Sequence, residues 1–168
     1  SASWANIRGL LASNINDLKI YEEGSYESPK SDVWGISDLD LFKEANQVLR
    51  ENKKPFFSII QTSGFHRPYT IPEDNNGFTV LSENDLEYDL TKNGFKHIKE
   101  FNSLRLMDHS VGEFIKIAKK EDYFNNTLFV FFGDHGTATN TGSHVPLSEK
   151  ALGLGIFRVP LVIYGPKL

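Results

Sequence analysis

The chain has 168 residues, of which 39% are hydrophobic and 24% are charged, and this composition suits one globular domain with a packed core rather than a disordered chain. The formal net charge of -4 gives no basic surplus that could neutralise a nucleic-acid backbone, so we predict no nucleic-acid partner. Cysteine is absent, which excludes disulfides and thiolate metal sites, and no apolar run approaches the roughly 20 residues of a membrane span. Any membrane anchor is therefore expected outside this chain.

The first third of the chain is predicted to hold two helices separated by extended and irregular segments. Helical spacing predicts a short helix over residues 4–11, followed by a short strand over residues 18–21. Residues 22–32 are rich in Glu, Ser, Gly and Pro, which is typical of an exposed loop. The Ser-Asp pair at 37–38 can cap a second helix, which should end near Asn52.

The rest of the chain alternates apolar strand candidates with helical segments. Residues 56–60 and 127–132 are short apolar runs of the kind expected for strands buried on both faces. Residues 83–121 form the longest helical region, in which Gly94 and Gly112 are expected to mark a break or a close packing point. Residues 157–164 are a third strand candidate, whose proline belongs at the start of the strand or at a sheet edge.

The order of these elements predicts the fold class. Strands separated by long helical stretches are typical of βαβ construction. We therefore predict an α/β fold, with a mostly parallel sheet that carries helices on both faces.

Asp134 and His135 are the best candidates for metal ligands. They directly follow the predicted strand at residues 127–132, and open α/β sheets bind ligands in the crevice outside the carboxyl ends of their strands. A carboxylate and an imidazole suit a divalent ion, and Gly133 and Gly136 leave the backbone free to aim both side chains. The alternative is a capped turn with a surface histidine.

Three further residues could join this site. His66 follows the run at residues 56–60, so it would rise into the same crevice as Asp134 and His135 if the two strands are parallel neighbours. Arg67 could hold an anionic oxygen through its planar guanidinium. His144 could be another ligand or an anion contact, and an ordinary loop position remains the alternative for His66 and His144.

Aromatic and basic residues elsewhere have weaker functional signals. Trp4 and Arg8 lie one helical turn apart, so they could grip a sugar or phosphate headgroup together, although packing explains Trp4 equally well. Trp34 is interpreted as a buried aromatic at a helix start rather than as a substrate platform. His97 and His109 fall in the long helical region, where a packed or surface role is favoured.

Several motifs together resemble one enzyme family. The sequence FGDHG at residues 132–136, followed by FRVPLVIY at residues 157–164, resembles the closing part of sulfatases and lipoteichoic acid synthases of the alkaline phosphatase superfamily. The preceding order of motifs looks like the membrane-bound phosphoglycerol transferase branch: WGISD at 34–38, FFSII at 56–60, HRPY at 66–69 and LMDHSVGEF at 106–114. The resemblance implies that residues 1–168 are the C-terminal portion of such a catalytic domain.

The resemblance also implies roles for the candidate residues. Asp134 and His135 would bind a Mn, Zn, Mg or Ca ion, and His66 would contact the phosphate or sulfate group of the substrate. Trp4 and Arg8 would contact its headgroup. The family also needs a metal-bound Thr, Ser or formylglycine nucleophile and another acidic ligand, which are expected before residue 1. The isolated fragment is therefore expected to be inactive.

Two classes of function remain open from the sequence. The first is metal-dependent transfer or hydrolysis of a phosphate or sulfate ester, on a substrate that can carry a lipid or glycan headgroup. The resemblance would place the full-length protein at the extracytoplasmic face of the bacterial cell membrane. The second is a non-catalytic α/β module, in which the Asp-His pair binds a structural ion or nothing and the chain serves interaction.

Overall fold

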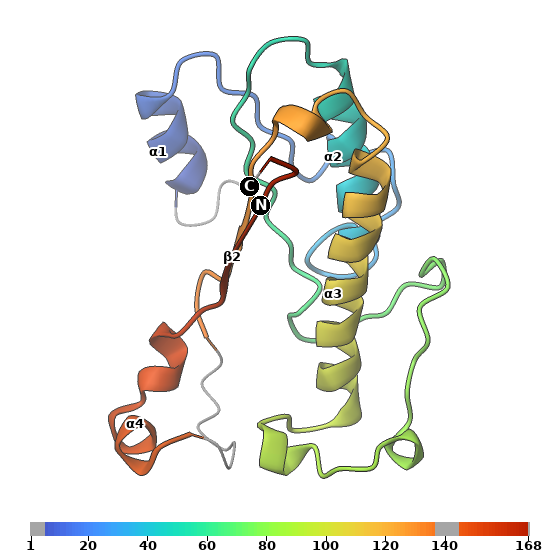
Figure 1. The fold of residues 1–168 in the computed structure, drawn as a ribbon, viewed down its shortest axis with the longest axis vertical. Helices are drawn as coiled ribbons and strands as arrows, with labels where there is room; N and C mark the ends of the chain where they lie inside the picture. The colour runs from blue at the N-terminus through green and yellow to red at the C-terminus, as the bar shows by residue number, and fades with distance from the viewer. Residues whose placement is uncertain (1–5, 137–144, 168) are drawn as a thin grey trace.

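The computed structural model describes residues 6–136 and 145–167. The helices and strands in these ranges are α1 (Ile7–Asn14), α2 (Asp38–Glu51), α3 (Ile98–Ala118), β1 (Phe129–Phe132), α4 (Leu147–Leu152) and β2 (Leu161–Tyr164). Figure 1 shows α2 and α3 together on one side, β2 running beside them, and α4 at the far end of the strand pair. None of the helices in this part of the chain has the length and apolar character that crossing a membrane requires.

Helix α2 begins and ends where its sequence signals predict. The Ser37 hydroxyl accepts a hydrogen bond from the Asp40 backbone N–H at 3.1 Å and donates to the Asp40 carboxylate at 2.8 Å. This reciprocal cap satisfies an N–H group that the first helical turn would otherwise leave without a partner. Acidic side chains in the first turn and Arg50 in the last turn complement the helix dipole, and Asn52 follows as the C-cap.

Helix α3 is shorter than the helical region predicted for residues 83–121. Two 3₁₀ turns, η2 (Glu83–Asp85) and η3 (Thr91–Asn93), precede it instead. Gly94 ends η3 with a positive φ of 92°, which confirms the predicted break. The ring Nδ1 of His97 then caps α3 by accepting a hydrogen bond from the Glu100 N–H at 3.2 Å. Gly112, by contrast, is exposed with open space around it, so it marks no close packing.

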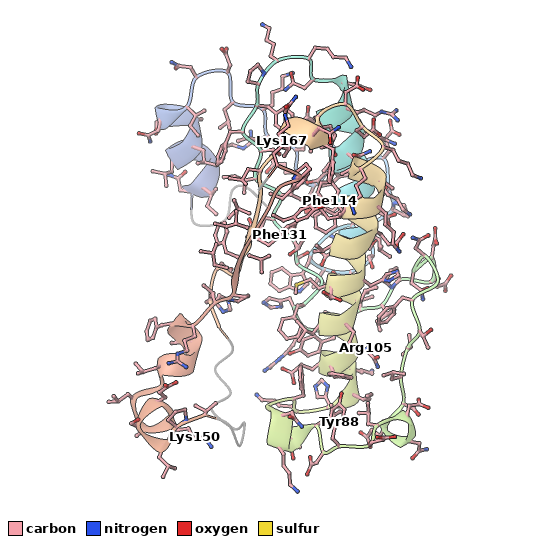
Figure 2. The ribbon with its side chains drawn as sticks, viewed as in Figure 1. Tyr88, Arg105, Phe114, Phe131, Lys150 and Lys167 are labelled. Atoms are coloured by element: carbon pink, nitrogen blue, oxygen red, sulfur yellow. The ribbon has the colours of Figure 1, made fainter. Side chains whose placement is uncertain are left out.

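An aromatic core joins α2, α3 and β1. Phe114 of α3 stacks on Phe42 of α2 with ring centroids 4.9 Å apart, and it meets Phe129 of β1 edge-on at 6.1 Å. Phe124, in the 3₁₀ turn η4 (Phe124–Asn126), packs against Phe129 at 5.5 Å. Figure 2 shows Phe131 and Phe114 near this core, whereas Lys150 of α4 lies well away from it. The phenylalanine-rich composition thus supplies the main packing contact between helices and strands.

The strands pair in a way that the sequence did not predict. β1 and β2 form a two-stranded antiparallel sheet, with Phe129 opposite Tyr164 and Phe132 opposite Leu161. Pro160 directly precedes β2, which confirms its predicted place at a strand start, because proline cannot donate a hydrogen bond within the ladder. The expected parallel sheet is not confirmed by the part of the chain that the structure describes.

The strands predicted at residues 18–21 and 56–60 are not present. Neither segment has regular secondary structure, and neither pairs with another strand among the described residues. In the second segment Phe57 is 87% exposed and Ile59 is 68% exposed, while Phe56 and Ile60 pack against the aromatic core. The prediction of a strand buried on both faces is wrong here, because only one face of this run meets a packed layer. The apolar pattern predicted contact with the core but not a hydrogen-bonding partner.

Candidate functional site

The predicted metal ligands lie in the turn that follows β1. Asp134 and His135 are exposed, and the Asp134 Oδ2 and His135 Nε2 atoms are 3.9 Å apart. The backbone N–H of His135 donates to Asp134 Oδ1 at 2.9 Å, which holds the carboxylate over the turn. Two adjacent residues thus present an oxygen and a nitrogen from the end of the strand to solvent.

The orientation of the His135 ring is set by the glycine that follows. His135 Nδ1 lies 2.8 Å from the carbonyl oxygen of Gly136, a geometry in which Nδ1 carries the proton and donates it. Nε2 is then left with its lone pair. Histidines that bind metals usually have their second ring nitrogen held in this way, by a carbonyl or a carboxylate.

Gly136 is also the point where this turn meets the segment before β2. Its N–H donates to the Ile156 carbonyl at 2.8 Å. A Cβ at this position would collide with the carbonyl oxygen of Gly155 and lie 2.7 Å from that of Arg158. Only glycine allows this approach, so the backbone contact fixes the position of the Asp134–His135 turn relative to the second strand.

The donor pair has the chemistry for one divalent ion. A carboxylate oxygen and an imidazole nitrogen each bind zinc at roughly 2.0 to 2.2 Å, so two such ligands of one tetrahedral ion lie about 3.3 to 3.6 Å apart. The observed 3.9 Å between Asp134 Oδ2 and His135 Nε2 is a few tenths of an ångström wider, so a small rotation of these exposed side chains would bring both within reach of one ion. Among residues 6–136 and 145–167, no group of three or more His, Cys, Asp or Glu side chains gathers around a common point. Further ligands would therefore have to come from outside these residues.

The predicted substrate contacts His66 and Arg67 lie in a separate loop held by Trp34. The indole ring of Trp34 lies 3.9 Å from the imidazole of His66, centroid to centroid, at an angle of 50°. Its Nε1–H donates to the Arg67 carbonyl at 2.5 Å, and the Tyr69 N–H closes the turn onto the His66 carbonyl at 2.8 Å. Trp34 is 48% exposed, so the interpretation of a buried aromatic at the helix start is wrong. The indole supports the loop instead.

A buried carboxylate holds the start of the same loop. Asp38, the first residue of α2, is 5% exposed and accepts hydrogen bonds from the backbone N–H groups of Ser63 and Gly64, each at 3.0 Å to Oδ1. Burial raises the pKa of Asp38, and the N–H donors of Ser63 and Gly64 oppose that rise. From the opposite side, the Ser103 hydroxyl donates to the Gly64 carbonyl at 2.7 Å. The sequence indicated Asp38 only as a helix-start residue, and its place in the WGISD motif was the signal available.

The other predicted site residues are distributed more widely. Arg8 of α1 forms an ion pair with Glu22. Trp4 and His144 lie outside the described residues. Within those residues, no hydrogen bond, ion pair or ring contact joins the loop of His66 and Arg67 to the turn of Asp134 and His135, so their convergence on one crevice stays a prediction.

His97 and His109 have the structural roles that were favoured for them. His97 is the N-cap of α3, and its ring lies 5.5 Å from that of Tyr69. The His109 ring packs against Phe78 at 5.5 Å between centroids. Neither residue needs a catalytic role to explain its position.

Comparison with known proteins agrees with the motifs. The family model described as Sulfatase matches residues 9–168. The chain is 29% identical over 139 residues to a lipoteichoic acid synthase of Staphylococcus saprophyticus, a match that covers 80% of this chain and 20% of that protein. It is 29% identical over 145 residues to the lipoteichoic acid synthase-like YvgJ of Bacillus subtilis, covering 81% of this chain and 22% of that protein. The chain therefore spans about a fifth of the length of these relatives.

Two solved structures have the same fold. A protein in the alkaline phosphatase superfamily from Vibrio parahaemolyticus superposes with a TM-score of 0.70 and 30% identity, covering 98% of this chain and 36% of that one. The lipoteichoic acid synthase LtaP from Listeria monocytogenes superposes with a TM-score of 0.72 and 21% identity, covering 100% of this chain and 42% of that one. These neighbours support the predicted α/β class. The chain belongs to the sulfatase and lipoteichoic acid synthase-like family of the alkaline phosphatase superfamily.

Proposed function

We propose that this chain is part of a metal-dependent enzyme that transfers or hydrolyses a phosphate or sulfate ester, and that it supplies part of the metal and substrate site. The observation that carries the proposal is the turn after β1, in which Asp134 Oδ2 and His135 Nε2 lie 3.9 Å apart with the other ring nitrogen of His135 held by a carbonyl. Family membership supports the reaction class. Two relatives are named as a lipoteichoic acid synthase or synthase-like protein, which favours a phosphate-containing group over a sulfate.

Asp134 and His135 would hold one divalent cation, with Mn, Zn, Mg and Ca all compatible with a carboxylate and an imidazole. When bound, such an ion offsets negative charge on the ester oxygens and lowers the pKa of an attacking hydroxyl. The Gly136 carbonyl keeps the proton of His135 on Nδ1, so Nε2 stays available as a ligand. The nucleophile, a Thr, Ser or formylglycine, would come from a segment outside this chain.

His66 and Arg67 would contact the anionic oxygens of the transferred group. The planar guanidinium of Arg67 can make paired hydrogen bonds to two oxygens, and the His66 imidazole can donate one more. Trp4 and Arg8 would contact a lipid or glycan headgroup, with Arg8 exchanging its ion pair to Glu22 for the ligand, and His144 would be a further contact. The complete enzyme would work at the extracytoplasmic face of the bacterial membrane, with its anchor outside this chain.

The metal assignment is tested by removing each ligand in the complete protein. We expect Asp134→Ala and His135→Ala each to lower bound metal and turnover together. The loss should be at least about 100-fold, because removing even a residue that only orients a metal ligand costs about 10- to 100-fold. Bound metal is measured by plasma mass spectrometry. Turnover is measured as diacylglycerol release from phosphatidylglycerol, and as p-nitrophenol release from p-nitrophenyl sulfate.

Asp122→Ala is the matched control, because Asp122, like Asp134, is an exposed aspartate, and its ion pair to Lys53 is long, at 3.9 Å. It should leave metal content and turnover unchanged. Metal content equal to wild type in both ligand variants would contradict the proposal. The two substrates separate a phosphoglycerol transferase from a sulfate-ester hydrolase.

A further inference from the structure

The loop that carries His66 and Arg67 is held from both sides at Gly64, through the N–H and the C=O of that residue. Asp38 of α2 binds the N–H groups of Ser63 and Gly64 through its carboxylate, and both carboxylate oxygens lie within 3.1 Å of the Gly64 nitrogen. Ser103 of α3 donates to the carbonyl oxygen of Gly64 at 2.7 Å. The helix N-terminus and the neighbouring helix thus hold the donor side and the acceptor side of the loop.

Asp38 and Ser103 are both buried where they contact the loop. Asp38 is 5% exposed and Ser103 is 1% exposed, so neither side chain can exchange its loop partner for bulk water. A Cβ on Gly64 would lie 2.5 Å from Asp38 Oδ2, so the carboxylate closes directly onto a glycine backbone. Buried polar groups that lose their partner pay the cost of desolvation without a hydrogen bond, which makes this arrangement stiff.

We propose that Asp38 and Ser103 are positioning residues. They clamp the backbone at Ser63 and Gly64 and thereby hold His66 and Arg67 in place for the substrate. Gly64 precedes His66 by two residues, so a shift at the clamp moves the imidazole directly. Reacting groups must be held closely, since a misplacement of about 1 Å can cost roughly 100-fold in rate. The assignment rests on the proposed function, because it takes His66 and Arg67 as substrate contacts.

The molecule offers a matched pair of serines for the test. Ser103 and Ser110 both lie in α3, are fully buried, and donate a hydrogen bond of 2.7 Å to a carbonyl oxygen. Ser103 bonds to Gly64 in the loop, whereas Ser110 bonds to Leu106 within its own helix. Changing either to alanine removes one oxygen atom and adds nothing. The two variants therefore differ only in whether the loop loses its clamp.

The experiment measures kcat/KM of the complete enzyme on phosphatidylglycerol for wild type, Ser103→Ala and Ser110→Ala. We expect Ser103→Ala to lower kcat/KM roughly 3- to 10-fold, as the loss of one hydrogen bond would, and Ser110→Ala to leave it unchanged. Hydrogen exchange gives a second readout. The Ser63 and Gly64 amides should exchange faster in Ser103→Ala than in Ser110→Ala.

The same comparison is repeated in a His66→Ala background. If the clamp acts through His66, Ser103→Ala should have little further effect there, because residues that act as one unit are not additive. The carboxylate side is tested in parallel with Asp38→Ala, expected to lower kcat/KM by about 10- to 100-fold, and with Asp38→Asn, which keeps one oxygen for both N–H donors and should restore most of that loss.

The control for the carboxylate is Asn102→Ala. Asn102 is 2% exposed and clamps a different loop, by accepting from the Leu81 N–H at 3.0 Å and donating to the Leu81 carbonyl at 2.8 Å.

Two outcomes would overturn the positioning role and leave the proposed function intact. One is an equal loss of kcat/KM in Ser103→Ala and Ser110→Ala, and the other is a Ser103→Ala effect of the same size in the His66→Ala background. A wild-type enzyme that turns over neither phosphatidylglycerol nor p-nitrophenyl sulfate would overturn the proposed function as well.

Discussion

Asp38 and Asp134 show how one residue type takes two roles through its surroundings. The Asp134 side chain is 78% exposed at the end of a strand, where it can hold a cation, and only its own turn constrains it. Asp38 is buried, and its carboxylate already accepts hydrogen bonds from backbone N–H groups. It therefore has little capacity to bind a ligand and instead holds the loop beside it. The difference lies in burial, because a buried carboxylate must satisfy its oxygens inside the protein.

The raised pKa of Asp38 leads to a pH-dependent stability. Burial favours the protonated form of Asp38 in the folded state. The contribution of Asp38 to stability is therefore fully present below its unfolded pKa of about 4. That contribution is lost as pH rises through the folded pKa. The side-chain amide of the Asp38→Asn variant does not titrate. We therefore expect the urea midpoint of wild type, relative to Asp38→Asn, to fall as pH rises from about 4 to 8. A rising difference would mean that the Ser63 and Gly64 hydrogen bonds outweigh burial.

At the level of elements, two glycines have opposite reasons to be glycine. Gly112 lies inside α3 with open space around it, so no contact requires the absence of a side chain. At Gly136, a Cβ would collide with the carbonyl oxygens of Gly155 and Arg158. The Gly136 carbonyl also accepts the hydrogen bond from Nδ1 of His135. The first glycine is a weak point of a helix, and the second is a requirement of the candidate metal turn.

Alanine at these two positions should therefore act in opposite directions. Gly112→Ala is expected to stabilise the protein by about 0.5 to 1 kcal/mol, because alanine loses less backbone entropy in a helix. Gly136→Ala is expected to destabilise it and to lower metal content, since the turn must move away from residues 155–158. Thermal unfolding and metal analysis of the complete protein check both. Equal metal content in Gly136→Ala and wild type would show that the turn tolerates displacement.

At the scale of the whole molecule, one aromatic core organises the helices and strands. In the strand pair Phe129 is buried in this core and Tyr164 is partly buried against it, while Phe132 is 68% exposed and Leu161 is 64% exposed. Figure 1 shows the strand pair and α4 extending away from the helices beyond this contact. The packing that holds the part of the chain described here is therefore concentrated near Phe114.

Removing the centre of this core should have a large effect. Phe114 is 3% exposed and contacts Phe42 and Phe129. Phe114→Ala is expected to cost about 3 to 5 kcal/mol, the range for deleting a buried aromatic ring and leaving a cavity. Leu147→Ala is the control, because Leu147 is 83% exposed and should change stability by less than about 0.5 kcal/mol. Similar denaturation midpoints for both variants would contradict this account of the core.

Features that depend on neighbouring residues were predictable from the sequence. The Ser37 cap, the end of α2 near Asn52 and the start of β2 after Pro160 agree with the structure. The strand predicted at residues 127–132 forms at Phe129–Phe132, but the prediction that both its faces are buried is wrong, because Val130 and Phe132 are exposed. Caps, prolines and apolar periodicity act over a few residues, so their signals are complete within a short window. The motif order likewise identified the family.

Features that depend on distant segments were decided by packing. Whether residues 56–60 pair as a strand, and whether β1 meets a parallel or an antiparallel neighbour, depends on which chain segments lie beside them. The contact of Trp34 with His66 and the burial of Asp38 against Gly64 join residues about 25 to 35 positions apart. An apolar run or a carboxylate has the same local signal whether it ends covered or exposed, because burial is a property of the assembled layers.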